Sequence, residues 1–120
     1  MSTPDNCVSI VPYFRVHQNK MDEFKDLCKE FTDTTKNEEN VLYYGFVING
    51  NIVHCREGYI GAEGALAHLD NVGHLVEKAL QISELIKFEV HGQKEDLDKL
   101  RDPLKDFDID YFEYVCGFRK

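Results

Sequence analysis

Positive charge is scarce in this sequence. Its 120 residues include 14 lysines and arginines against 22 aspartates and glutamates, which gives a formal net charge of -8. A surface of this sign repels the phosphates of nucleic acids and the headgroups of anionic membranes. We therefore expect neither a nucleic-acid partner nor a membrane partner.

Long apolar stretches are also missing. No run is long enough to span a bilayer, and residues 1–6 lack the basic segment followed by an apolar run that marks a secretory signal. These absences predict a cytoplasmic protein. A hydrophobic content of 42% in a chain of this length suits one modest core, so residues 1–120 are expected to form a single domain.

The four cysteines contain no Cys-x-x-Cys pair: Cys7, Cys28, Cys55 and Cys116 lie far apart. Free cysteine behaves as a small hydrophobic residue, so we expect buried, reduced thiols. A zinc site would need cysteine and histidine side chains to converge, and no local spacing indicates this. No metal is expected.

Apolar periodicity predicts the first half of the chain. Residues 7–16 are rich in β-branched and aromatic side chains and indicate a strand, and an amphipathic helix follows from residue 20. Two further strands, 41–48 and 52–59, flank Asn49-Gly50-Asn51, which favours a tight hairpin turn.

The second half of the chain also alternates between helices and strands. A helix follows Gly61, with a break or bend expected at 71–73, and then a strand at 85–91. An extra C-terminal helix and strand are expected within about 94–118, the helix at 94–104 and the strand at 111–118. This order predicts an α+β, ferredoxin-like fold, in which helices cover one face of an antiparallel sheet.

The other face of such a sheet would be open to solvent. We expect it to carry an apolar patch, and such patches usually mark interfaces. The residues assigned to this patch are Tyr13, Phe46, Val53, Tyr111, Phe112 and Tyr114. A homodimer that closes two sheets into a barrel would cover it.

One motif links the third strand to the second helix. It reads Glu-x-Tyr-x-x-x-Glu-x-x-x-x-His, and its four named positions are Glu57, Tyr59, Glu63 and His68. This motif, together with the strand at 8–16, Glu38 and the run 42–44, resembles the antibiotic biosynthesis monooxygenase family of dimeric α+β barrels. The sequence departs from the family pattern in having Asn40 where glycine is common and in placing a second helical histidine, His74, one residue late.

The resemblance implies a possible activity. Some members of this family are monooxygenases that oxidise quinols or polycyclic phenols without a metal or flavin, so no cofactor is expected; other members degrade haem or have no known reaction. In an oxygenase of this kind a base removes the phenolic proton before dioxygen reacts. His68 is the candidate base, and a buried structural histidine is the alternative.

The remaining site predictions concern binding. Tyr44 and Tyr59 each have an aromatic body and a polar tip suited to lining a cavity between the second helix and the sheet. His54 and Arg56 share the opposite face of their strand, where Arg56 could hold a carboxylate or phenolate, or else form a salt bridge. Asn71 and His74 complete the expected ligand-binding set. Glu57 and Glu63 are assigned to the structural motif.

Three functions stay open from the sequence. The first is a cofactor-independent monooxygenase, and the second is a non-catalytic carrier or sensor for an elongated apolar molecule such as a fatty acid. The third is a structural or interaction module with a well-packed core. The first two require an apolar small molecule as substrate or ligand.

Overall fold

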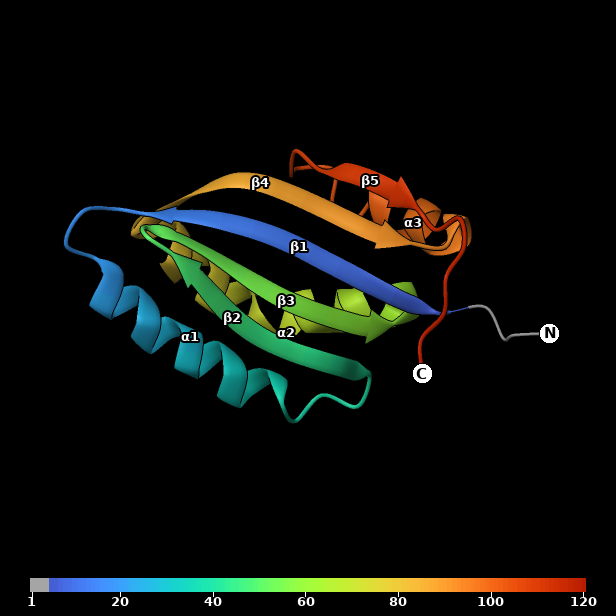
Figure 1. The fold of residues 1–120 in the computed structure, drawn as a ribbon, viewed down its shortest axis with the longest axis horizontal. Helices are drawn as coiled ribbons and strands as arrows, with labels where there is room; N and C mark the ends of the chain where they lie inside the picture. The colour runs from blue at the N-terminus through green and yellow to red at the C-terminus, as the bar shows by residue number, and fades with distance from the viewer. Residues whose placement is uncertain (1–4) are drawn as a thin grey trace.

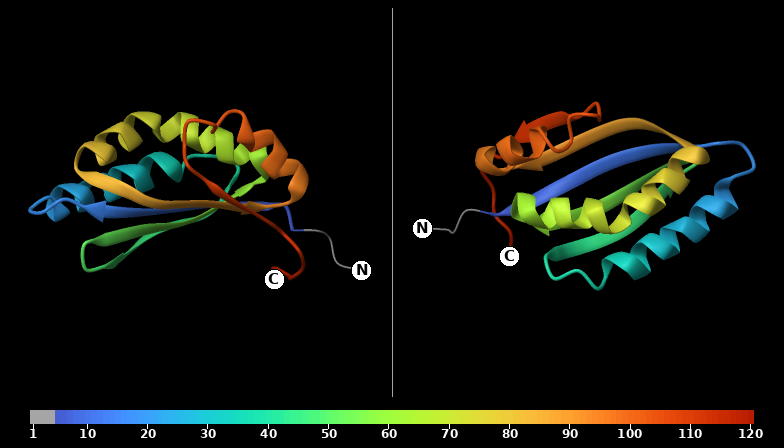
Figure 2. Two further views of the ribbon diagram at one scale, coloured as in Figure 1. Left: turned by 90° about the horizontal axis from the view of Figure 1, so that it is seen from above. Right: turned by 180° about the vertical axis from the view of Figure 1, so that it is seen from behind.

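Within residues 5–120, five strands form one sheet and three helices cover one of its faces (Figures 1 and 2). A computed structural model describes residues 5–120. In chain order the elements are β1 (Cys7–Val16), α1 (Met21–Thr35), β2 (Val41–Asn49), β3 (Ile52–Ile60), α2 (Gly61–Gln81), β4 (Ser83–Gly92), α3 (Lys94–Arg101) and β5 (Asp110–Glu113). The fold is α+β and ferredoxin-like, as predicted. None of the helices within 5–120 is both long enough and apolar enough to cross a membrane.

The sheet has the strand order β2-β3-β1-β4-β5. Pairing is antiparallel between β2 and β3, between β3 and β1 and between β1 and β4, but β4 and β5 pair parallel. The prediction of a wholly antiparallel sheet was therefore wrong at its last strand. That strand is also shorter than expected, because ladder pairing with β4 stops at Glu113 instead of continuing to residue 118.

Alternation along β1 and β3 separates the two faces of the sheet. On β1 the even-numbered residues from Val8 to Val16 are buried beneath the helices, whereas the odd-numbered ones lie on the open face. The register pairs Ile10 with Glu57, so Glu57 also lies beneath the helices. This face therefore holds the core, and it also carries the buried polar residues of the candidate site.

The helix α2 runs without interruption from Gly61 to Gln81. The break expected at 71–73 is absent. Val72 and Leu75 are buried on the sheet side of this segment, and a Cβ at Gly73 would meet nothing within 4 Å. Packing of the apolar side chains thus keeps the helix continuous, at the small cost of one interior glycine.

Two glycines have backbone conformations that favour their residue type. Gly50 turns the β2–β3 hairpin with φ +60°, and Gly61 begins α2 with φ +67°. The Gly61 amide donates to the carbonyl of Asn6. This turn directs the chain from the end of β3 straight into the helix that carries His68.

The open face differs from the one expected. Val53 and Phe46 belong to the core beneath the helices, because the register places both on the helix side of the sheet. Tyr13 does lie on the open face, where its ring stacks on His54 with centroids 4.2 Å apart. All four cysteines are free, but Cys55 alone is buried; Cys7 and Cys28 are half-buried and Cys116 is exposed, so the expectation of buried thiols holds for Cys55 only.

Candidate active site

A largely apolar cavity lies between α2 and the sheet. Its volume is about 330 Å³. Its walls come from α1, α2, β1, β2, β3 and β4 and from the segment after α3, and include Phe24, Phe31, Phe46, Val72, Val76, Leu85 and Phe88. Tyr44, Glu57 and His68 are among the few polar side chains that reach it. The cavity expected between the second helix and the sheet is therefore present.

His68 lies between two carboxylates. Its Nδ1 is 2.9 Å from Oε2 of Glu38, and its Nε2 is 3.3 Å from Oε1 of Glu57. His68 is 2% exposed and Glu57 is 5% exposed. Each carboxylate comes from a different part of the chain: Glu38 from the loop between α1 and β2, and Glu57 from β3.

The charge state of His68 follows from these contacts. Burial alone would lower the pKa of the imidazole, but the hydrogen bonds and negative charges of Glu57 and Glu38 outweigh burial and raise the pKa. With both ring nitrogens facing carboxylate oxygens, the protonated ring can donate to both. Both contacts therefore favour a positively charged ring held between two acids.

Glu57 accepts a second buried hydrogen bond. The hydroxyl of Tyr59 donates to Oε1 of Glu57 at 2.6 Å. Both Tyr59 and His68 approach Oε1, which leaves Oε2 free of these two donors. Burial, followed by the charge of Glu57, raises the pKa of the Tyr59 phenol, so this tyrosine stays a neutral donor.

Tyr44 and Cys55 complete the polar side of the cavity. The Tyr44 ring lies 5.4 Å from the His68 ring, centroid to centroid. Burial is the main reason that the pKa values of the Tyr44 phenol and the Cys55 thiol are raised, and the charge of Glu57 adds to both. Glu57 is thus surrounded by neutral donors and one imidazolium.

Within residues 5–120, no group of three or more His, Cys, Asp and Glu side chains is arranged to hold a metal ion. His54, His68 and His74 do not converge: His54 lies on the open face of the sheet, His68 beneath the helices, and His74 is exposed on α2. The chemistry that the described side chains offer is acid–base chemistry beside an apolar cavity.

The structure divides the predicted site residues into two groups. Tyr44, Glu57 and His68 line the cavity, and Tyr59 packs behind them with its ring stacked on that of His68. His54 and Arg56 lie on the opposite face, as their alternation predicted, and border a separate shallow hollow with Tyr43 and His91. The Nδ1 of His54 is 2.7 Å from the carbonyl oxygen of Pro12.

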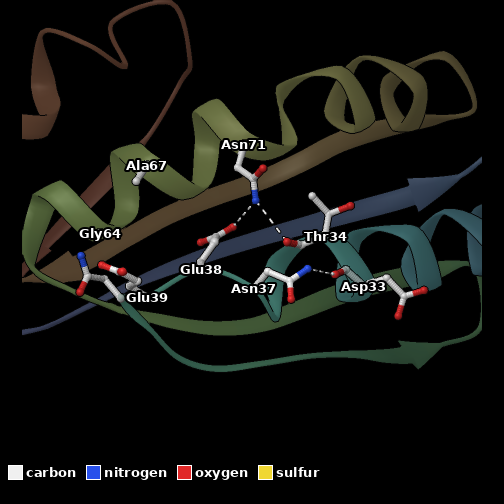
Figure 3. Close-up of a pocket in the computed structure, with 9 residues that line it drawn as sticks. Asp33, Thr34, Asn37, Glu38, Glu39, Gly64, Ala67 and Asn71 are labelled. Carbon is white, nitrogen blue, oxygen red and sulfur yellow. Dashed lines mark hydrogen bonds between the residues drawn. The ribbon is translucent and has the colours of Figure 1, made fainter.

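Asn71 and Glu63 have other surroundings. Asn71 does not reach the cavity; its side-chain amide donates to Oε2 of Glu38 at 2.9 Å and to the carbonyl of Thr34 at 3.2 Å (Figure 3). Glu63 is exposed and pairs with Lys99 at 3.0 Å.

Glu38 is the site residue that sequence reasoning missed. In the sequence it is only one position of the family resemblance, yet its carboxylate binds His68 directly. The two residues are 30 positions apart, and Glu38 follows a helix end with no local motif around it. The only signal available was its place in the family pattern.

Comparisons with solved structures place the chain among known folds. It is 38% identical to MupZ from Pseudomonas fluorescens, with a TM-score of 0.92 over 97% of this chain and 96% of that chain. A candidate antibiotic biosynthesis monooxygenase from Nitrosomonas europaea is 13% identical, with a TM-score of 0.68 over 78% of this chain and 96% of that chain. Another, from Bacteroides thetaiotaomicron, is 17% identical, with a TM-score of 0.62 over 69% and 85%.

A scan against protein-family models found no match, and neither did a search of curated proteins. At their level of identity, the two monooxygenase candidates establish the fold alone. The similarity to MupZ extends over nearly the whole of both chains, including the C-terminal helix and strand.

Proposed function

We propose that this chain, which belongs to the same family as MupZ from Pseudomonas fluorescens and shares its fold with candidate antibiotic biosynthesis monooxygenases, is a cofactor-independent monooxygenase that oxidises a small quinol or phenol in the cavity beneath α2. One observation carries the proposal: a buried glutamate and histidine, Glu57 and His68, face an otherwise largely apolar cavity. Its volume of about 330 Å³ lies near the lower end of the range for ligand sites, about 300–1,000 Å³. This size favours a substrate of up to three fused rings over a larger polycyclic one.

Glu57 and His68 would act as a pair in the first step. Both nitrogens of His68 already face carboxylates, so the imidazolium has no free position for a substrate proton. Glu57 lines the cavity and has Oε2 free of His68 and Tyr59, and we assign it the role of taking the proton. His68 keeps its positive charge beside the phenolate that forms, and this charge stabilises the phenolate.

Dioxygen reacts in the second step. The substrate anion passes one electron to dioxygen, which gives a substrate radical and superoxide, and these two combine to a peroxide. Glu57 returns its proton to the peroxide, and loss of water then leaves a carbonyl group. With anthrone as substrate, a CH₂ group becomes C=O: one oxygen atom enters the product and the other leaves as water with the two hydrogens.

A carrier or sensor for an apolar molecule is the second candidate. The predominance of apolar side chains around the cavity favours it, because such walls bind apolar ligands without any reaction. The third possibility, a structural or interaction module with a well-packed core, is less well supported, since the cavity leaves room between α2 and the sheet.

Oxygen uptake tests the proposal. Purified metal-free protein should consume dioxygen with anthrone or a naphthalene quinol, measured with an oxygen electrode against protein-free controls for autoxidation. Glu57→Gln should lower the rate about a hundredfold or more, as for loss of a general base. His68→Ala should lower the rate by a similar factor, because it removes the positive charge that stabilises the phenolate. Glu63→Gln is the matched control, because Glu63 lies in the same motif but is exposed.

Each outcome distinguishes the candidates. Oxygen uptake that survives both substitutions would refute the assignment of the base. Binding of the same molecules with no oxygen uptake would refute the monooxygenase and favour the carrier.

A further inference from the structure

The second carboxylate at His68 has no role in the chemistry described so far. Glu57 alone would neutralise the imidazolium, yet Glu38 lies closer to the ring, 2.9 Å from Nδ1 against 3.3 Å for Glu57 from Nε2. Across residues 5–120, neither carboxylate forms an ion pair with a lysine or an arginine. The cluster of Glu38, His68 and Glu57 therefore holds one negative charge more than it needs to be neutral.

Glu38 is fixed in place from the surface side. Its loop borders a polar groove of about 710 Å³ between the end of α1 and α2, whose lining includes Thr34, Glu38, Glu39 and Asn71 (Figure 3). Asn71, one turn beyond His68 on α2, donates to Glu38 and to the carbonyl of Thr34. The Glu38 side chain is 11% exposed, so its charge is only weakly screened by water.

The charges change when the site reacts. Before the reaction Glu57 is the negative partner of His68 on the cavity side. Once Glu57 has taken the substrate's proton, it is neutral and no longer supports the imidazolium. A buried imidazolium without a counterion would lose its proton, because burial disfavours the charged form.

We propose that Glu38 is a positioning residue that keeps His68 protonated while Glu57 holds the substrate's proton. This inference rests on the proposed function and adds to it a division of labour between the two acids. The proton moves from the substrate oxygen to Glu57, and the total charge of substrate, Glu57, His68 and Glu38 stays at minus one. His68 then remains a cation beside the new phenolate.

The other groups that face His68 cannot replace Glu38. The ring of Tyr59 on β3 stacks on the His68 ring, the ring of Tyr44 on β2 lies tilted to it, and Cys55 on β3 lies beside Glu57. Burial raises the pKa of each of these three groups, so each is neutral near pH 7. Glu38 is the remaining acid on the ring.

Nuclear magnetic resonance of ¹⁵N-histidine-labelled protein tests this without any substrate. Long-range ¹H–¹⁵N spectra show directly whether both nitrogens of His68 carry protons. Glu57→Gln mimics the state in which Glu57 is neutral. We expect His68 to stay protonated at pH 7 in E57Q and to be neutral in the double variant E38Q/E57Q. The control E39Q removes a neighbouring exposed charge and should resemble wild type.

The proposal is overturned if His68 loses its proton at the same pH in E57Q and in the double variant. Should the double variant not fold, the single variant E38Q decides: its His68 must lose the proton at a lower pH than in wild type, and an unchanged midpoint overturns the proposal. In oxygen uptake with anthrone, E38Q should lower kcat by about tenfold or more and shift its pH profile, with E39Q unchanged. If the spectra agree and no variant consumes oxygen, the counterion role stands and the proposed function fails.

Discussion

The ring of Tyr59 stacks on the ring of His68, with centroids 4.6 Å apart and planes inclined by 28°. Tyr59 comes from β3 and is fully buried, whereas His68 comes from α2. The Tyr59 hydroxyl also donates to Glu57, the carboxylate that faces His68 from the sheet. One tyrosine therefore holds both members of the proposed catalytic pair, through its ring and through its hydroxyl.

Removing that hydroxyl should destabilise the fold. Tyr59→Phe keeps the stacked ring but leaves Glu57 with one donor fewer in a buried position, which we expect to lower the free energy of unfolding by about 1–3 kcal/mol. Urea unfolding followed by circular dichroism measures it. Tyr43→Phe is the matched control, since the Tyr43 hydroxyl bonds Ser9 at the exposed surface. Equal, small effects of both substitutions would contradict the role given to Tyr59.

The stability that His68 contributes should depend on pH. Its pKa in the folded protein is raised above the usual value of about 6.5. A raised pKa stabilises the folded state below the unfolded pKa, and this contribution is lost as pH rises through the folded pKa. The difference in unfolding free energy between wild type and His68→Gln should therefore be largest near pH 6 and shrink toward pH 9.

Urea unfolding at several pH values between 6 and 9 measures this difference. His74→Gln is the control, because His74 is exposed on the same helix. A difference between wild type and H68Q that grows with pH would show that the carboxylates do not hold a charged ring.

Filling the cavity should abolish binding of apolar molecules. Val76 is partly buried on α2 and lines the cavity, so Val76→Phe places a larger side chain inside it. We expect fluorescence of an apolar dye, displaced by anthrone, to show a loss of affinity of about tenfold or more, at a cost in stability of about 1–3 kcal/mol for overpacking. The control Ile86→Phe adds the same ring at an exposed position on β4 that is not part of the cavity. Unchanged affinity in V76F would place the ligand elsewhere.

The open face of the sheet should form the interface of a homodimer. Exposed apolar side chains lie on this side of β2 and β5, among them Tyr43, Val47 and Phe112. Sedimentation should give a dimer at micromolar concentration that salt hardly weakens, since burial of apolar surface does not depend on screened charges. Val47→Asp should dissociate it, whereas Thr32→Asp on the outer side of α1 should not. A stable wild-type monomer would refute this arrangement, and deletion of 110–120 should weaken the dimer.

The thiols of Cys28, Cys55 and Cys116 should react with an alkylating reagent at very different rates. Burial raises the pKa of Cys28 to about 11 and raises that of the buried Cys55 as well, so both are almost entirely un-ionised at pH 8. The thiolate is the reactive form, and Cys116 is exposed. Brief treatment with iodoacetamide at pH 8 should alkylate Cys116 and spare Cys28 and Cys55, as read by peptide mass spectrometry. Modification of Cys55 at a similar rate would show that the cavity wall opens readily.

The sequence by itself determined the elements whose signals are local. The alternating strand at 7–16, the amphipathic helix that starts after residue 20 and the Asn-Gly hairpin all depend on neighbours within a few positions, and β1, α1 and the β2–β3 turn have these places in the structure. The same alternation correctly separated His54 and Arg56 from Glu57 on β3. The motif around His68 indicated the fold because its spacing follows from the strand, turn and helix that carry it.

Only the tertiary structure decided which distant residues meet. The parallel pairing of β5 and the burial of Phe46 and Val53 follow from strand register, which involves residues far apart in sequence. The continuity of α2 depends on the core into which Val72 and Leu75 pack. The contact between Glu38 and His68 forms because α2 crosses the sheet beside the α1–β2 loop, and no spacing within either segment records how close the two side chains come.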